Sequence, residues 1–127
     1  MSEKEMVINI FGDEIEACCY DPMTGYFRDG FCNTDEHDYG SHVVCAVMTV
    51  DFLEFSKSKG NDLSTPRPEF NFPGLKEGDR WCLCALRWKE AYDAGVAPKV
   101  HLESCHLNSL NFVTKEQLEE HAVNRLN

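Results

Sequence analysis

Long apolar runs are missing from this chain of 127 residues. The longest of them, residues 43–48, is far shorter than the roughly 20 residues that a membrane-spanning helix needs. The first six residues carry two glutamates and a lysine and lead into no apolar segment, so they do not resemble a secretory signal. We therefore expect a cytoplasmic protein with no membrane partner.

Basic residues are also scarce, with 12 lysines and arginines against 22 aspartates and glutamates and a net charge of −10. Such a surface repels phosphate backbones, so we expect no nucleic-acid partner. The chain has no glycine-rich phosphate loop and no nucleophile-elbow motif, and neither nucleotide binding nor α/β-hydrolase chemistry is supported. Paired cysteines with two-residue gaps, a usual zinc spacing, are missing as well.

The length fits a single domain over residues 1–127. Hydrophobic spacing and turn residues predict an α+β fold, with a small antiparallel or mixed sheet, about three helices and a long ordered loop containing proline and glycine. The expected strands cover residues 7–11, 43–50 and 99–105, with a hairpin over 26–33. The expected helices cover residues 51–59, 79–95 and 114–126, and the loop covers 61–78.

Cysteine is the abundant reactive residue, and its seven copies are an odd number. In a reducing compartment we expect free thiols rather than a disulfide framework. The motif Cys82-Leu83-Cys84 would put two thiols on one face if it were a strand, and on different sides if it were a helix. The apolar stripe of residues 81, 84, 85, 88 and 92 favours the helix, with Cys84 in the core and Cys82 in the first turn.

Two groups of residues could carry out thiol chemistry. In the first, Cys82 or Cys45 acts as a nucleophile or redox thiol, with His42 or His106 as its base. His42 and Cys45 are three residues apart and face opposite sides of an uninterrupted strand, so they cooperate only if the strand starts after His42. In the second, residues 101, 103 and 105 alternate on one strand face, but a solvent-facing edge explains them better.

A metal site is a further alternative. Cys18, Cys32, Cys45 and Cys82 could bind zinc, which the composition permits but the spacing does not require. The polar segment of residues 60–66 is another feature, because it packs amide, carboxylate and hydroxyl groups into a turn stiffened by proline. It could line a ligand pocket or simply cap its own backbone.

Five segments together resemble a known family, and they are DPMTGYFRDG at 21–30, GSHVVCA at 40–46, GNDLSTP at 60–66, FPGL at 72–75 and GDRWCLCA at 78–85. In this order they are similar to domain-of-unknown-function family 2237, a group of small, mostly bacterial proteins. The resemblance covers residues 9–113. It implies no particular activity, cofactor or partner.

The resemblance does mark a set of signature positions, many of them polar. These are Cys18, Thr24, Arg28, Cys32, His42, Cys45, Asn61, Asp62, Asp79, Trp81, Cys82, Cys84, Arg87, Trp88 and His106. Cys19 and Cys105 look like departures from the family pattern, which makes them the cysteines least expected to have a function.

Our leading hypothesis is therefore a small-molecule site in a polar pocket lined by thiols and built from Arg28, His42, Asn61, Asp62 and Asp79. Its alternatives are the thiol-dependent enzyme or redox protein, the zinc-binding domain, and a structural module whose contact surface includes residue 88 or the 70–72 loop. The sequence leaves the oligomeric state open.

Overall fold

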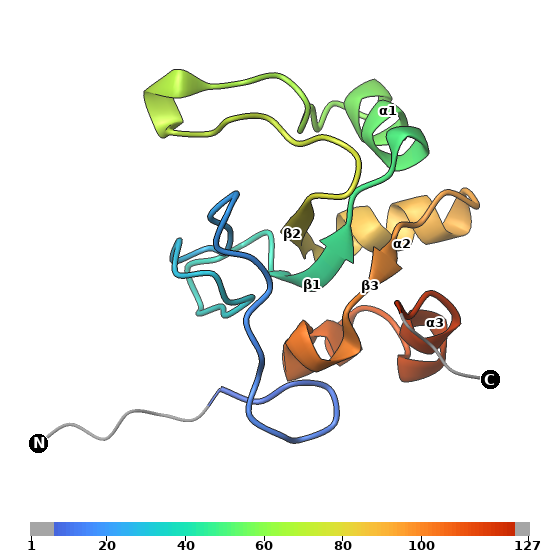
Figure 1. Ribbon diagram of the computed structural model, residues 1–127. Coiled ribbons are helices and arrows are strands. Elements are labelled where there is room, and N and C mark those ends of the chain that lie inside the picture. The colour runs from blue at the N-terminus through green and yellow to red at the C-terminus, as the bar shows by residue number, and fades with distance from the viewer. Residues whose placement is uncertain (1–6, 124–127) are drawn as a thin grey trace, which may run out of the picture.

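A computed structural model describes residues 7–123 of the chain (Figure 1). Its sheet has three antiparallel strands in the order β2-β1-β3, formed by β1 (His42–Val47), β2 (Arg80–Cys84) and β3 (Lys99–Val100). With α1 (Val50–Ser58), α2 (Ala85–Asp93) and α3 (Lys115–Glu120), this arrangement confirms the predicted α+β class. Within residues 7–123, no helix is long and apolar enough to cross a membrane.

The central strand β1 is buried over its middle four residues and pairs with both of its neighbours. It begins at His42 and ends at Val47, so it is shifted from the predicted range of 43–50. The difference comes from Thr49, whose hydroxyl accepts a hydrogen bond from the backbone N–H of Phe52 and caps α1. The helix predicted over residues 51–59 is confirmed, and Gly60 follows its end.

The single helix expected over residues 79–95 is wrong. Residues 80–84 form β2, and α2 begins directly after Cys84. The apolar stripe misled the prediction because residues 81–83 are buried on both faces of a strand, and such a run does not distinguish a strand from a helix. The carboxylate of Asp79 accepts a hydrogen bond from the backbone N–H of Lys76 instead of capping a helix.

Three other predicted elements are also corrected. Residues 7–11 form only isolated bridges, one from Ile8 to Glu14 and one from Asn9 to His106. The hairpin over 26–33 does not form, and the carbonyl of Gly30 instead accepts hydrogen bonds from the N–H groups of residues 18 and 19. In the 99–105 segment only the first two residues pair, and residues 102–104 turn into a short 3-10 helix.

The C-terminal helix starts as predicted, with a capping box between Thr114 and Gln117. It ends at Glu120, earlier than the predicted residue 126, and residues 124–127 lie outside the described part of the chain. The loop over 61–78 is irregular apart from a 3-10 turn at Pro68–Phe70. Its base is closed by the N–H of Leu75, which donates to the carbonyl of Leu63 at 2.7 Å.

The N-terminal third, residues 7–41, is a set of turns that packs against one side of the sheet, opposite α1 and α2 in Figure 1. Thr24 connects it to β2, because the buried Thr24 hydroxyl accepts a hydrogen bond from the backbone N–H of Cys82 at 2.8 Å. That N–H is buried in the core, as is the threonine oxygen that accepts it.

We expect the substitution Thr24→Val, which keeps the side-chain shape, to lower the free energy of unfolding by about 1–3 kcal/mol. The cost arises because it leaves the buried Cys82 N–H without an acceptor. Urea unfolding of the non-reduced protein measures it. Thr65→Val is the matched control, because the Thr65 hydroxyl bonds Asp62 in an exposed loop, and we expect a change of about 0.5 kcal/mol or less there. Equal effects of the two substitutions would contradict the role assigned to Thr24.

Candidate functional site

His42 and Asp38 form a histidine–carboxylate pair at the start of β1. The Nδ1 atom of His42 lies 2.7 Å from Oδ1 of Asp38, and the carboxylate's other oxygen accepts the backbone N–H of His42 at 2.9 Å. The hydroxyl of Thr34 donates to that second oxygen at 3.0 Å. The Asp38 side chain is 1% exposed and that of His42 is 40% exposed, so the carboxylate is buried behind an accessible ring.

The charge state of Asp38 fixes how the ring is protonated. Burial raises the pKa of the Asp38 carboxyl, but the hydrogen bonds from His42 and Thr34 and the charge of His42 outweigh it and lower the pKa below its ordinary value. An ionised carboxylate only accepts hydrogen bonds, so Nδ1 of His42 carries the proton that is shared with it. This leaves Nε2 as the ring's free position, and Nε2 makes no hydrogen bond within residues 7–123.

The position of His42 depends on an irregularity in the sheet. His42 pairs with Cys84, and Val44 with Leu83, so Val43 is an extra residue that forms a bulge in β1. Directly paired residues in an antiparallel ladder have neighbouring side chains on one face. The bulge thus makes Cys84 the cross-strand partner of His42, and the two residues line one hollow. The preceding turn allows this, because Ser41 has a φ of +49° and a Cβ at Gly40 would lie only 2.7 Å from Cε1 of His42.

Two adjoining hollows open around this histidine, and we call them together the His42 cleft. One has a volume of about 300 Å³ and the other about 240 Å³, which is enough for a small molecule. They share three lining residues, His42, Leu63 and Trp81. The first hollow is also lined by Gly40, Asn61, Leu83, Cys84 and Arg87, and the second by Gly25, Tyr26, Arg28 and Cys82.

Cationic side chains line both ends of the His42 cleft. The Arg28 guanidinium lies 5.2 Å from the centre of the Trp81 ring, and it donates one hydrogen bond to the carbonyl of Gly25. Arg87 contacts Glu90 at 3.3 Å and the carbonyl of Lys59 at the same distance. Each guanidinium keeps further N–H groups beyond these bonds. The cleft is therefore suited to an anionic ligand, although the chain as a whole carries a charge of −10.

Cys84 stands at the junction where β2 passes directly into α2. It is half-buried, forms no disulfide and makes no side-chain capping bond to the helix. The first N–H groups of a helix have no partner within the helix. The N–H of Ala85 donates to the carbonyl of Ser41, and those of the next two residues have no acceptor within the described range. A thiol and free amide donors thus follow one another along the chain at the start of α2.

A comparison with known protein families matches nearly the whole chain. A family model described as "Uncharacterized protein conserved in bacteria (DUF2237)" matches residues 8–122. The chain belongs to this family. The match confirms the resemblance inferred from the five motifs. A search of curated proteins finds no match.

The five residues predicted to form a ligand pocket are only partly brought together. Arg28, His42 and Asn61 line the His42 cleft. Asp62 instead caps its own loop, accepting hydrogen bonds from residues 64 and 65, which lower the pKa of its carboxyl. Asp79 lines a separate hollow beside Pro22 and Lys76.

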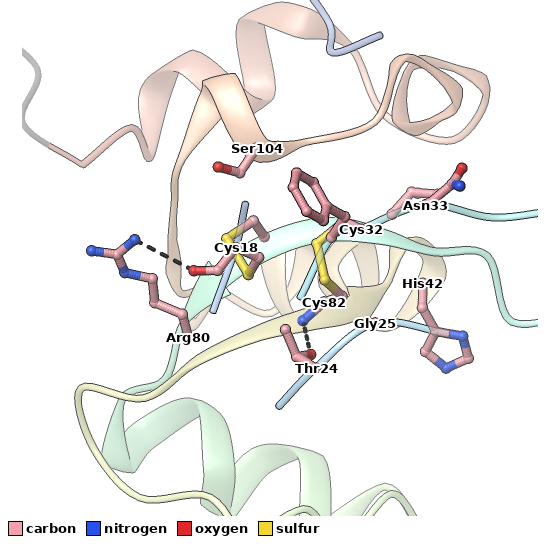
Figure 2. The surroundings of a disulfide bond; sticks show 12 residues. Cys18, Thr24, Gly25, Cys32, Asn33, His42, Arg80, Cys82 and Ser104 are labelled. Atoms are coloured by element: carbon pink, nitrogen blue, oxygen red, sulfur yellow. Dashed lines mark hydrogen bonds between the residues drawn. A yellow bond between two sulfur atoms is a disulfide. The ribbon is translucent and has the colours of Figure 1, made fainter. Parts of the chain in front are cut away.

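Four of the seven cysteines are joined in two buried disulfides, so the expectation of free thiols is wrong for them. Cys18 is bonded to Cys45 and Cys32 to Cys82. Figure 2 shows the Cys32–Cys82 bond beside Cys18, with Thr24 contacting the backbone of Cys82. The prediction failed because the bridged residues are 27 and 50 positions apart, and their spacing does not reveal that the segments meet.

These bonds affect the predicted catalytic pairs. A cysteine in a disulfide has no thiolate, so neither Cys45 nor Cys82 is a nucleophile in this form. His106 also has another task, because its Nδ1 accepts the N–H of Asn108 and caps a 3-10 helix. The residues predicted to bind zinc, in contrast, do lie together, and the sulfurs of Cys18, Cys32 and Cys82 are all within 4.8 Å of one another.

The sequence interpretation missed two residues of this site. Asp38 lies outside the quoted motifs, and its only signal is its spacing of four residues before His42. Cys84 was placed in a helix core because β2 was taken for a helix. Among the free cysteines it differs from Cys105, whose thiol is fully buried, and burial raises the pKa of that thiol to about 12. Cys19 is the third free cysteine.

The lowered pKa of Asp38 predicts how stability depends on pH. A carboxyl whose pKa is lower in the folded state stabilises the fold above its ordinary pKa, and this contribution disappears as the pH falls through the folded-state pKa. We expect wild-type protein to exceed the Asp38→Asn variant in unfolding free energy at pH 5–7, and the difference to shrink below about pH 4. Urea unfolding across this range measures it. The exposed substitution Glu36→Gln is the control, and a difference that grows towards low pH would refute the prediction.

Proposed function

We propose that this protein is a thiol-dependent enzyme that binds a small anionic substrate in the His42 cleft and attacks it with Cys84. The observation that carries this proposal is the register of the bulged sheet, which sets Cys84 opposite a histidine held by a buried carboxylate. A nucleophile, a base and a group that orients the base are the three parts of a nucleophilic site.

Each residue of the site has a distinct role in this reaction. Asp38 keeps the proton of His42 on Nδ1, so that Nε2 can accept the proton of the Cys84 thiol. The sulfur of Cys84 then forms a bond to an electrophilic carbon of the substrate. The leaving group departs with the electron pair of the broken bond and can take the proton back from His42. If the carbon is a carbonyl, the free amides at the start of α2 face the developing negative charge.

Substrate binding rests on the cationic groups of the cleft. The Arg28 guanidinium lies over the Trp81 ring, and this contact limits its freedom before a ligand arrives. Asn61 adds an amide group, and its backbone is fixed to α1 by two hydrogen bonds with Ser56. A ligand with a carboxylate or phosphate and a short carbon skeleton matches this lining and the available volume.

Alkylation by iodoacetamide tests the nucleophile, with the site of labelling identified by peptide mass spectrometry. We expect Cys84 to react faster than Cys19 in the native protein, and Cys105 to react only after unfolding. His42→Gln and Asp38→Asn should slow the labelling of Cys84 by about tenfold or more, since the thiol loses its base. Cys19 in the same sample is the internal control, because its rate should not change. The proposal fails if Cys84 labels no faster than Cys19, or if His42→Gln has no effect.

Iodoacetate tests the charge preference of the cleft, because it differs from iodoacetamide in carrying a carboxylate. The ratio of the iodoacetate rate to the iodoacetamide rate should be higher at Cys84 than at Cys19. We expect Arg28→Gln to reduce this ratio at Cys84 and to leave the iodoacetamide rate nearly unchanged. Arg67→Gln, a change in the exposed loop, is the matched control and should leave both rates as they are. Equal ratios at Cys84 and Cys19 would exclude an anion-binding role for the cleft.

A further inference from the structure

The four bridged cysteines form one compact cluster in the core. Cys45 on β1 and Cys82 on β2 are directly paired across the sheet, and each is bonded to a cysteine from the N-terminal turns. All four are at most 2% exposed. Three of the sulfurs, those of Cys18, Cys32 and Cys82, lie within 4.8 Å of one another, and the fourth is bonded to the sulfur of Cys18. The Cys45 sulfur lies outside this group of three and is tied to it by its bond to Cys18, so four sulfurs from four separate segments lie close together in the core.

We propose that, when reduced, these four thiols bind one zinc ion, and that the two disulfides are the oxidised state of the same site. A tetrahedral zinc ion has bonds to thiolate sulfur of about 2.3 Å, which places the sulfurs about 3.8 Å apart. This spacing lies between that of a disulfide and the 4.8 Å span of the three sulfurs of Cys18, Cys32 and Cys82, and the Cys45 sulfur has to move inward to join them. In this proposal, rotations of the four cysteine side chains connect the two states.

The surroundings of the cluster fit such an ion. Zinc with four thiolates has a charge of −2, and a buried negative charge needs compensation. Arg80 lies beside the cluster and contacts the carbonyl of Cys18 at 3.4 Å, and Arg28 lines the same hollow as Cys82. Because the protein supplies all four ligands, no position is left for substrate, and the ion would have a structural role. It would fasten the N-terminal turns to the sheet, as the disulfides do.

The exchange between the two states balances with a small-molecule disulfide as the oxidant. Each of two oxidant molecules accepts two electrons, and its S–S bond breaks to give two thiolates. The four cysteine thiolates lose these four electrons and form the Cys18–Cys45 and Cys32–Cys82 bonds. The zinc ion then has no ligands and leaves. Glutathione disulfide is a suitable probe of this class.

Zinc titration of the full chain, reduced without oxygen and freed of metal, tests the proposal. We expect one tightly bound zinc per chain, measured by elemental analysis after gel filtration and by competition with a coloured chelator. Cobalt should replace zinc and give the intense charge-transfer absorption of a tetrahedral thiolate site. Reduced protein that binds no zinc would overturn the proposal.

Two sets of variants identify the ligands. The triple variant Cys19→Ser, Cys84→Ser, Cys105→Ser keeps all four proposed ligands and should bind one zinc with unchanged affinity. Cys32→Ser should weaken binding by more than about 100-fold, since even the loss of a residue that only orients a ligand costs 10- to 100-fold. Loss of zinc binding by the triple variant would refute the assignment, even if Cys32→Ser failed to fold. Because the triple variant lacks Cys84, its zinc binding is independent of the proposed enzyme activity.

Oxidation tests the link between the two states. Adding two equivalents of glutathione disulfide to the zinc-bound chain should release the ion and lower the number of titratable thiols from seven to three. Peptide mapping should then find the Cys18–Cys45 and Cys32–Cys82 bonds. Retention of zinc together with both disulfides would show that the ion binds elsewhere and would overturn the proposal.

Discussion

The antiparallel pairing of β1 with β2 is the constraint on which the rest of the molecule depends. One register sets Cys45 opposite Cys82 in the core and, beyond the bulge at Val43, sets His42 opposite Cys84 at the surface. Without the bulge, Val43 would pair with Cys84, and the His42 ring would point to the other face. A single extra residue therefore separates a buried sulfur cluster from an accessible site that combines a thiol with an imidazole.

The N-terminal turns depend on this pairing because they have no helix or continuous strand between residues 7 and 41. Their attachment includes the two bridges to β1 and β2, the Thr24 contact, backbone hydrogen bonds to the segment around residues 103–107, and apolar residues that join the core. Bridges that close loops of 27 and 50 residues each stabilise a fold by about 3–4 kcal/mol in the chain-entropy view. This is a large share of the roughly 5–15 kcal/mol that keeps a domain folded. The two bridges therefore help to hold these turns, which carry Arg28, beside the cleft.

Local signals in the sequence predicted the elements that are determined locally. Thr114 with Gln117 and the segment before Gly60 were assigned correctly, because capping and helical spacing act over a few residues. The sheet was harder to predict, because strand pairing joins residues that are far apart in the sequence. The apolar run at 81–85 also fits the period of a strand and that of a helix equally well. The bulge has no sequence signature, so the pairing of His42 with Cys84 could not be derived. Nor could the contact of Asp38 with His42, which requires the turn at Ser41.

Cys82 and Cys84 show how strand geometry gives different chemistry to neighbouring residues of the same type. They lie on one face of β2, about 7 Å apart along the strand. Cys82 is opposite Cys45 and is enclosed by the N-terminal turns, whereas Cys84 lies at the edge of the core, where β2 ends and α2 begins. Because α2 packs on both β1 and β2, any shift of β2 caused by a change at Cys82 would also move the start of α2. The sulfur cluster and the His42 cleft are therefore connected through two residues of one strand.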